Sequence, residues 1–156
     1  MHNASPLQIE SGTAVTWTSR SRVAASLVLG PGDVVGWEAA FGLPPAPATA
    51  LTNVTACPTG EAVSAAALIR QLMSNYHAAL TLTLVARLAR WLVLIHERAD
   101  TDALPLTHGQ LAAMLAVRRA GVTEALHLLE GEGFVRSTRG LLVIRDRAGL
   151  EARAQG

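Results

Sequence analysis

The chain of 156 residues contains no lysine, a single cysteine and few aromatic residues. Since Cys57 has no second cysteine as a partner, an internal disulfide and an all-cysteine iron–sulfur site are excluded. No run of about 18 uninterrupted apolar residues occurs, which argues against a membrane span. Residues 1–6 lack the basic and apolar segments that are typical of a signal peptide. Together these absences favour a cytoplasmic protein.

The patterns that carry catalysis or bind cofactors are missing as well. The glycines at 30 and 32 are too closely spaced for a phosphate-binding loop and no lysine follows them. Neither a paired-histidine zinc motif nor the spacing of a Cys/His zinc site is present. His77 and His96 fit surface or interface positions better than haem ligation. We therefore expect no catalytic residue, no metal ligand and no cofactor, and the protein is not predicted to be an enzyme.

All basic residues of the chain are arginines, and their distribution is uneven. The net charge of the whole chain is only +1. Residues 118–147, however, hold six arginines against four acidic residues, which gives a net charge of +2. Arginine suits bidentate contacts with phosphate and guanine. An ordinary solvated surface could carry the same charge. The sequence around these arginines therefore has to distinguish such a surface from one that binds nucleic acid.

Residues 8–60 have the composition of strands and turns. Strands are expected over 14–18 and 23–29, where β-branched and apolar residues dominate, and over 51–57. Gly30-Pro31-Gly32-Asp33 predicts a turn, and the prolines between 44 and 47 predict a loop.

A helical pattern follows. Residues 64–72 are alanine-rich, and Tyr76 to Arg98 carries apolar side chains at helical spacing on two faces. A helix that is apolar on two faces must be covered on both. One face is expected to pack on the strands and the other on a second copy of the chain; burial within a single domain is the alternative. The polar segment 99–102 is the expected hinge to the last part of the chain.

The C-terminal third predicts a winged helix-turn-helix. Thr107 and Gln110 form a capping-box pattern at the start of a short helix. Ala116-Val117 leaves room only for a tight turn before a second helix, from about Arg118 to Glu130. Glycines 131 and 133 are expected to end that helix, and residues 134–144 predict a hairpin.

In such units the N-terminal residues of the second helix meet base edges in the major groove. Here those residues are Arg118, Arg119 and Thr123. Arg136 and Arg139 of the hairpin, together with Thr107, are expected to hold the DNA backbone. The alternative is a winged helix that makes only protein contacts.

These segments resemble the Crp/Fnr family of bacterial transcription regulators. The resemblance rests on runs within 87–98, on 104–107, 111–115 and 117–123, and on residues 139–151; it is weaker at 30–36. It implies an α+β fold with three parts. These are a partial β-roll of the cyclic-nucleotide-binding type at 1–75, a long dimerisation helix at 76–99 and a winged helix-turn-helix at 100–156.

The resemblance also implies a function. The expected protein is a homodimer that binds an inverted repeat in double-stranded DNA and regulates transcription. RNA polymerase and an unidentified small-molecule effector are further partners that the family allows. The competing interpretation is an interaction protein that has lost DNA binding and forms heterodimers with full-length relatives.

The sequence departs from the family in several places. Fewer strands precede Gly30 than the family's β-roll needs, so the N-terminal part is expected to be shortened. Trp37 separates Gly36 from Glu38, and residues 45–49 hold no arginine for a phosphate, so cyclic nucleotide binding is not expected. Within the second helix, the family's base-reading glutamate is Ala120 and a later arginine is Glu124. The base preference of the cyclic-AMP receptor therefore cannot be transferred.

Overall fold

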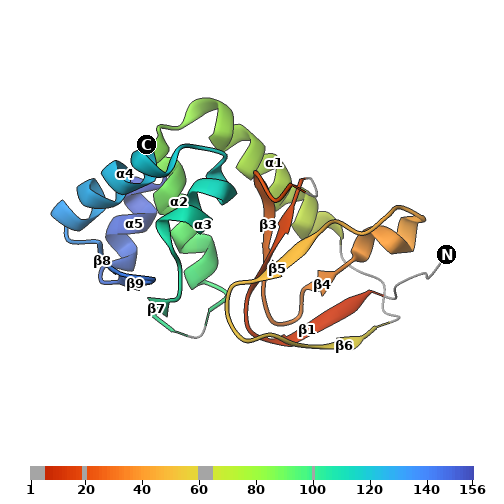
Figure 1. The fold of residues 1–156 in the computed structure, drawn as a ribbon. Helices are drawn as coiled ribbons and strands as arrows, with labels where there is room; N and C mark the ends of the chain where they lie inside the picture. The colour runs from red at the N-terminus through yellow and green to blue at the C-terminus, as the bar shows by residue number, and fades with distance from the viewer. Residues whose placement is uncertain (1–5, 19–20, 60–64, 100) are drawn as a thin grey trace.

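The computed structural model describes residues 6–18, 21–59, 65–99 and 101–156, and it has two units (Figure 1). Strands fill the N-terminal unit, and helices with a small sheet fill the C-terminal one. Helix α1 (Ala65–Thr81) runs along the strands and joins the two units. This architecture confirms the predicted α+β fold.

Two three-stranded antiparallel sheets make up the β-roll. One sheet has the order β4-β1-β6 and the other β3-β2-β5. A short 3-10 helix lies between β4 and β5. The bounds are β1 (Leu7–Ser11), β2 (Ala14–Trp17), β3 (Ala25–Leu29), β4 (Val34–Val35), η1 (Trp37–Phe41), β5 (Ala48–Ala50) and β6 (Thr55–Pro58).

Two expected strands begin later in the structure than the sequence predicts. The strand expected over 23–29 begins at Ala25, because Arg22 and Ala24 have left-handed backbones with φ of 54° and 61°. The strand expected over 51–57 begins only at Thr55. The backbone N–H groups of Leu51 and Thr52 both donate to the Thr13 carbonyl, which turns the chain before β6 starts. The turn predicted at Gly30–Asp33 is confirmed by the bond from Asp33 N to Gly30 O at 2.9 Å.

The prediction of a single helix from Tyr76 to Arg98 was wrong, because the chain forms two helices there. Helix α1 ends at Thr81, and α2 (Leu84–His96) begins after a break. Thr83 has an extended backbone, and its hydroxyl accepts a hydrogen bond from Ala86 N at 3.3 Å. This cap satisfies a backbone donor that a continuous helix would have used internally.

The two helices differ in how their apolar faces are covered. Helix α2 buries six residues, Leu88 and Leu92 among them, and packs against α4 and α5 of the C-terminal unit. Helix α1 packs one face on β3 through residues such as Leu68. A second face leaves four large side chains between 52% and 68% exposed. We call these the α1 stripe: Ile69, Met73, Tyr76 and Leu80.

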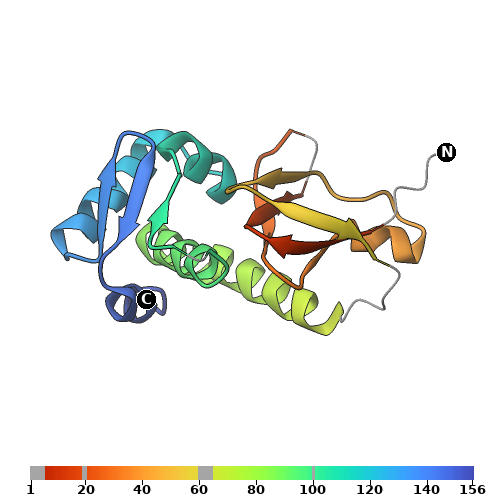
Figure 2. The same ribbon diagram turned by 90° about the horizontal axis from the view of Figure 1, so that it is seen from below.

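The C-terminal unit surrounds α2 with further helices and a small sheet (Figure 2). Its sheet has the order β7-β9-β8, and all pairs are antiparallel. Helix α5 was not predicted. The bounds are β7 (Ala103–Leu104), α3 (His108–Leu115), α4 (Arg119–Gly131), β8 (Val135–Thr138), β9 (Leu141–Ile144) and α5 (Arg147–Arg153).

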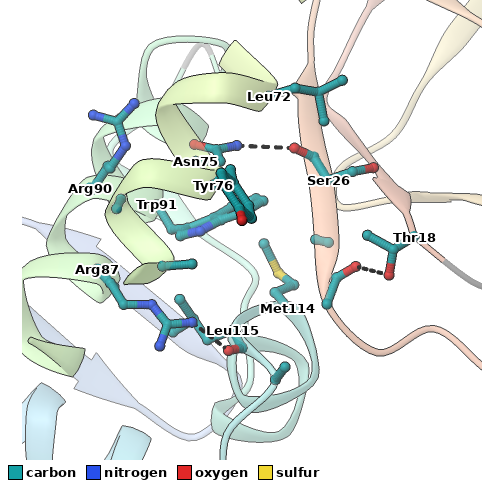
Figure 3. A pocket seen from close by; sticks show the side chains of 15 residues that line it. Thr18, Ser26, Leu72, Asn75, Tyr76, Arg87, Arg90, Trp91, Met114 and Leu115 are labelled. Carbon is teal, nitrogen blue, oxygen red and sulfur yellow. Dashed lines mark hydrogen bonds between the residues drawn. The ribbon is translucent and has the colours of Figure 1, made fainter. Parts of the chain in front are cut away.

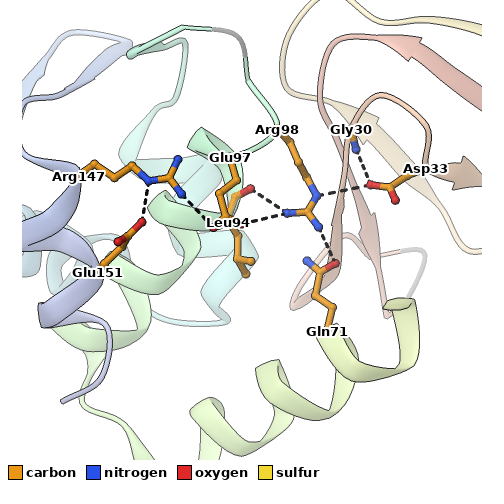
Figure 4. Close-up of polar contacts among 8 residues, drawn as sticks. All are labelled: Gly30, Asp33, Gln71, Leu94, Glu97, Arg98, Arg147 and Glu151. Atoms are coloured by element: carbon orange, nitrogen blue, oxygen red, sulfur yellow. Dashed lines mark hydrogen bonds and ion pairs between the residues drawn. The ribbon is translucent and has the colours of Figure 1, made fainter. Parts of the chain in front are cut away.

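Arg98 joins the two units at the end of α2 (Figure 4). Its Nε lies 3.5 Å from Oδ2 of Asp33 in the β3–β4 turn, and its Nη1 donates to the Leu94 carbonyl at 3.2 Å. The backbone of Gly30 lies so close that a Cβ there would come within 2.7 Å of the Arg98 Cβ. Glycine at this position therefore permits the close contact between the units.

A search of the described helices finds none that is both long and apolar enough to cross a membrane.

Candidate DNA-binding interface

Helix α3 begins with the capping box that the sequence predicts. The Thr107 hydroxyl accepts from Gln110 N at 3.2 Å, and Gln110 Oε1 accepts from Thr107 N at 2.8 Å. Two backbone donors at the helix start are thereby satisfied. The box fixes where α3 begins, and with it the position of the turn that follows.

The turn between α3 and α4 depends on one strained residue. Ala116 adopts the left-handed conformation, with φ 54° and ψ 46°. For a residue with a Cβ this conformation costs about 1–2 kcal/mol. The contacts around the turn compensate for this cost, among them the bond from the Arg87 guanidinium to the Leu115 carbonyl at 2.7 Å. The turn then delivers Arg118 at the start of α4.

Helix α4 can lie close to α2 because it contains a glycine. A Cβ at Gly121 would be 3.0 Å from Cδ2 of Leu84. Glycine inside a helix costs roughly 1 kcal/mol relative to alanine. At this position the missing side chain lets the first turn of α2 pack against α4. The inner face of α4 is buried through Val122, Ala125, Leu126 and Leu129.

The outer side of α4 borders a cleft of about 680 Å³ that we call the recognition cleft. Three elements form it: the start of α3, the outer face of α4 and the turn of the β8–β9 hairpin. The cleft brings together three of the predicted DNA-contacting residues: Thr107, Arg119 and Arg139. Arg118, Thr123 and Arg136 do not line it. Arg118 is the exposed N-cap of α4, and Arg136 is exposed on β8.

The four predicted arginines are all exposed: Arg118, Arg119, Arg136 and Arg139. None of them takes part in an ion pair among the residues that the structure describes. Arg147 and Arg153 of α5, by contrast, are paired with glutamates. The guanidinium groups around α4 and the hairpin are thus available to an anion, and the N-terminus of α4 adds its own backbone donors.

The Thr123 hydroxyl, predicted to contact DNA, already has hydrogen-bond partners within the protein. Its hydroxyl donates to the Arg119 carbonyl at 3.1 Å and lies 2.9 Å from Nδ1 of His108. The other ring nitrogen of His108, Nε2, lies 3.1 Å from Oγ of Ser137 on β8. His108 therefore links the start of α3 to both α4 and the hairpin. Any contact of Thr123 with DNA would compete with these bonds.

The recognition cleft contains two histidines that were not among the predicted site residues, His108 and His127. His127 follows Arg119 and Thr123 at intervals of four residues, so all three share one face of α4. That spacing was a usable signal. His108 had only its place beside the Thr107 cap, which gives no indication that its ring bridges two other elements.

The hairpin is held against α4 by a glutamate. The Glu130 carboxylate accepts a hydrogen bond from the backbone N–H of Ser137. The turn itself needs only Arg139 and Gly140, with φ of 78° at the glycine. Arg139 is thereby placed at the tip of a hairpin whose base is fixed to the helix.

The family comparison agrees with this arrangement. Residues 86–153 match the model of the Crp-like helix-turn-helix domain. The C-terminal unit is a Crp-like helix-turn-helix domain. The match begins inside α2, which agrees with the packing of that helix on α4 and α5. A search of curated proteins returns no match.

Solved structures extend the likeness to the whole fold. A Crp/Fnr-family transcriptional regulator from Thermus thermophilus is 22% identical, with a TM-score of 0.81 over 97% of this chain and 88% of its own. A second regulator from that organism is 21% identical, with a TM-score of 0.77 over 100% and 90%. A putative regulator from Eubacterium rectale is 21% identical, with a TM-score of 0.74 over 97% and 81%. The chain has the fold of a Crp/Fnr-type transcriptional regulator.

Proposed function

We propose that the chain regulates transcription by binding an inverted repeat in duplex DNA as a homodimer. The observation that carries the proposal is the set of exposed arginines around α4 and the hairpin, which have no acidic partner among the described residues. Arg119 would contact a base edge, and Arg118 would meet a base or a phosphate. Thr107, Thr123, Arg136 and Arg139 would hold the backbone on either side.

The α1 stripe supports the homodimer. Its members, at positions 69, 73, 76 and 80, follow the alternating spacing of four and three residues that marks the contact face of paired helices. Another face of α1 already packs on the β-roll, and no described residue of the chain covers the stripe, which leaves it to a second copy. Two α1 helices packed along it would place two recognition helices in one assembly, which favours a palindromic site.

Selection of bound sequences from a random duplex library tests both parts of the proposal. The expected product is an inverted repeat whose half-sites lie one helical turn apart, about 34 Å. Recovery of a single unrepeated half-site would contradict the homodimer. Absence of any enriched sequence would favour the alternative, an interaction protein without DNA binding.

With the selected duplex, Arg119→Ala should weaken specific binding by roughly 1–3 kcal/mol and relax one base position. Arg139→Ala should weaken all sequences alike and reduce the log–log salt slope by about 0.9. Arg147→Ala is the matched control, since this arginine of α5 lies outside the cleft and is paired with Glu97 at the end of α2 and with Glu151. If all three variants change binding equally, net charge rather than the recognition cleft determines affinity.

A further inference from the structure

The recognition cleft contains two histidines that the proposed function does not use. His108 is half-buried at the start of α3, and His127 is exposed on the outer face of α4. Histidine is the side chain whose charge ordinarily changes between about pH 5 and 8. A cleft that holds arginines for phosphate thus also holds two groups whose charge depends on pH.

The net charge of the cleft depends on these two side chains. Its other charged lining residues are Arg119 and Arg139 against Glu130, which gives a net charge of +1 while both histidines are neutral. Protonation of both rings raises this charge to +3. The chain contains no lysine, so only histidine can add to the charge of the arginines. Glu124 on α4 and Arg136 on β8 are exposed but do not line the cleft.

The hydrogen bonds of His108 accommodate both protonation states of its ring. The Thr123 hydroxyl donates to the Arg119 carbonyl at 3.1 Å, so it accepts from Nδ1 of His108, which lies 2.9 Å away. Nε2 lies 3.1 Å from Oγ of Ser137, a hydroxyl that can donate or accept. A proton added at Nε2 therefore reverses one hydrogen bond and breaks none. The bridge between α3, α4 and the hairpin stays intact when His108 becomes cationic.

His127 is available to a ligand. Within the described part of the chain its ring has no hydrogen-bond or ion-pair partner. The residue lies eight positions after Arg119, about 12 Å further along the axis of α4, and it lines the cleft together with Arg139. Its acidic neighbours on α4 are Glu124 and Glu130, three positions to either side. The start of a recognition helix meets base edges, so a side chain two turns later is placed for the DNA backbone.

A second cavity of the structure, of about 320 Å³, lacks this dependence on pH (Figure 3). It lies between the β2–β3 hairpin, α1, α2 and the end of α3, and no histidine is among the described residues that line it. Its basic groups are Arg87 and Arg90, which donate to the Leu115 carbonyl and to the Ser74 hydroxyl, each at 2.7 Å. Arginine stays charged throughout the range in which histidine titrates. Of these two cavities, only the recognition cleft has a charge that changes with pH.

We propose that His127 is a further DNA contact, which binds a backbone phosphate as the imidazolium together with Arg139, and that His108 adds a second proton-dependent charge to the same cleft. This inference rests on the proposed function. A phosphate in the cleft favours the charged form of each ring. Because such coupling is reciprocal, protonated rings increase the affinity for DNA. Binding therefore takes up protons. The affinity rises as the pH falls through the histidine range, and the gain is lost as the pH rises again.

The affinity of the full chain for the selected duplex is measured by fluorescence anisotropy between about pH 5.5 and 8.5 at constant ionic strength. We expect the affinity to rise about tenfold or more from the upper to the lower limit. The log–log salt slope should be steeper at the lower limit by about 0.9 for each histidine that meets a phosphate. A histidine that only held the fold together would leave this slope unchanged. Calorimetry in two buffers of different ionisation enthalpy measures the protons taken up.

Variants of the two histidines locate the titrating groups. His127→Gln should weaken binding at the lower pH limit about tenfold and reduce the pH dependence. His127→Arg carries a fixed charge, so it should reduce the pH dependence while it strengthens binding at the upper limit. His108→Gln should remove a further part of the dependence. If thermal unfolding shows that His108→Gln is unfolded, the two variants of the exposed His127 decide.

His96→Gln is the matched control for these variants. His96 is also a histidine of the C-terminal unit, but its ring is bonded to Asp102 at 2.7 Å and does not line the cleft. Glutamine retains a group that can donate to Asp102. This variant should keep the pH dependence and the salt slopes of the native chain.

Three results would overturn the inference and leave the proposed function standing. The first is an affinity for the duplex that does not change with pH. The second is a salt slope that is equal at both pH limits, and the third is a pH dependence that His127→Gln and His127→Arg both retain in full. A chain that binds no duplex at any of these pH values would instead refute the proposed function, and the role of the histidines with it.

Discussion

Helices α1 and α2 are neighbours in sequence, yet they are covered differently. Both carry apolar side chains on two faces. Helix α2 buries both faces inside the C-terminal unit, whereas α1 buries one and exposes the α1 stripe. Leu80 is 68% exposed, and Leu88, eight residues further on, is fully buried. Apolar periodicity thus reports that a face will be covered, but not whether the same chain or a second copy covers it.

The largest expected effect comes from truncating the buried member of that leucine pair. Leu88→Ala should lower the free energy of unfolding by about 2–5 kcal/mol, because it leaves a cavity between α2 and its neighbours. Urea unfolding measures this loss, which should not depend on protein concentration. The matched variant Leu80→Ala should change the value by less than about 0.5 kcal/mol in dilute protein. Equal losses in both variants under dilution would contradict the difference between the helices.

The second-largest expected effect is on dimer formation through the α1 stripe. Leu80→Glu places a charge where a partner helix is expected, so the dissociation constant of the dimer should rise about tenfold or more. Sedimentation velocity over a concentration series measures it. Ser74→Glu is the control: this exposed residue of α1 lies off the stripe and accepts a hydrogen bond from Arg90. A chain that is monomeric at all concentrations, or a dimer indifferent to Leu80→Glu, would remove α1 from the interface.

Local signals in the sequence predicted much of the recognition unit. The Thr107 cap, the tight turn at Ala116-Val117 and the hairpin within 134–144 each depend on a few adjacent residues, and each has a recognisable chemistry. The arginines at the start of α4 follow from those boundaries. What could not be predicted depends on contacts between distant residues. The bridge from His108 to Thr123 and Ser137 joins three elements, and no spacing along the chain indicates it.

The same limit explains the error at the helix break. Residues 80–95 keep their apolar periodicity across Leu82 and Thr83, so the pattern predicts one helix. The structure divides it because α2 packs with α4, where Gly121 accepts Leu84 closely, while α1 follows β3. The tertiary contacts of α1 and those of α2 require different helix directions. Thr83 caps the start of α2 at the point where the two helices separate. Periodicity alone cannot detect such a division.

The smallest expected effect tests that break directly. Thr83→Ala removes the hydroxyl that accepts from Ala86 N, so unfolding should become easier by about 0.5–2 kcal/mol. Thr81→Ala is the control, because the Thr81 hydroxyl donates to the His77 carbonyl inside α1 and caps nothing; its cost should stay below about 0.5 kcal/mol. In a continuous helix both threonines would be interior residues, and alanine would stabilise at each position. The sign of the Thr83→Ala change therefore decides between one helix and two.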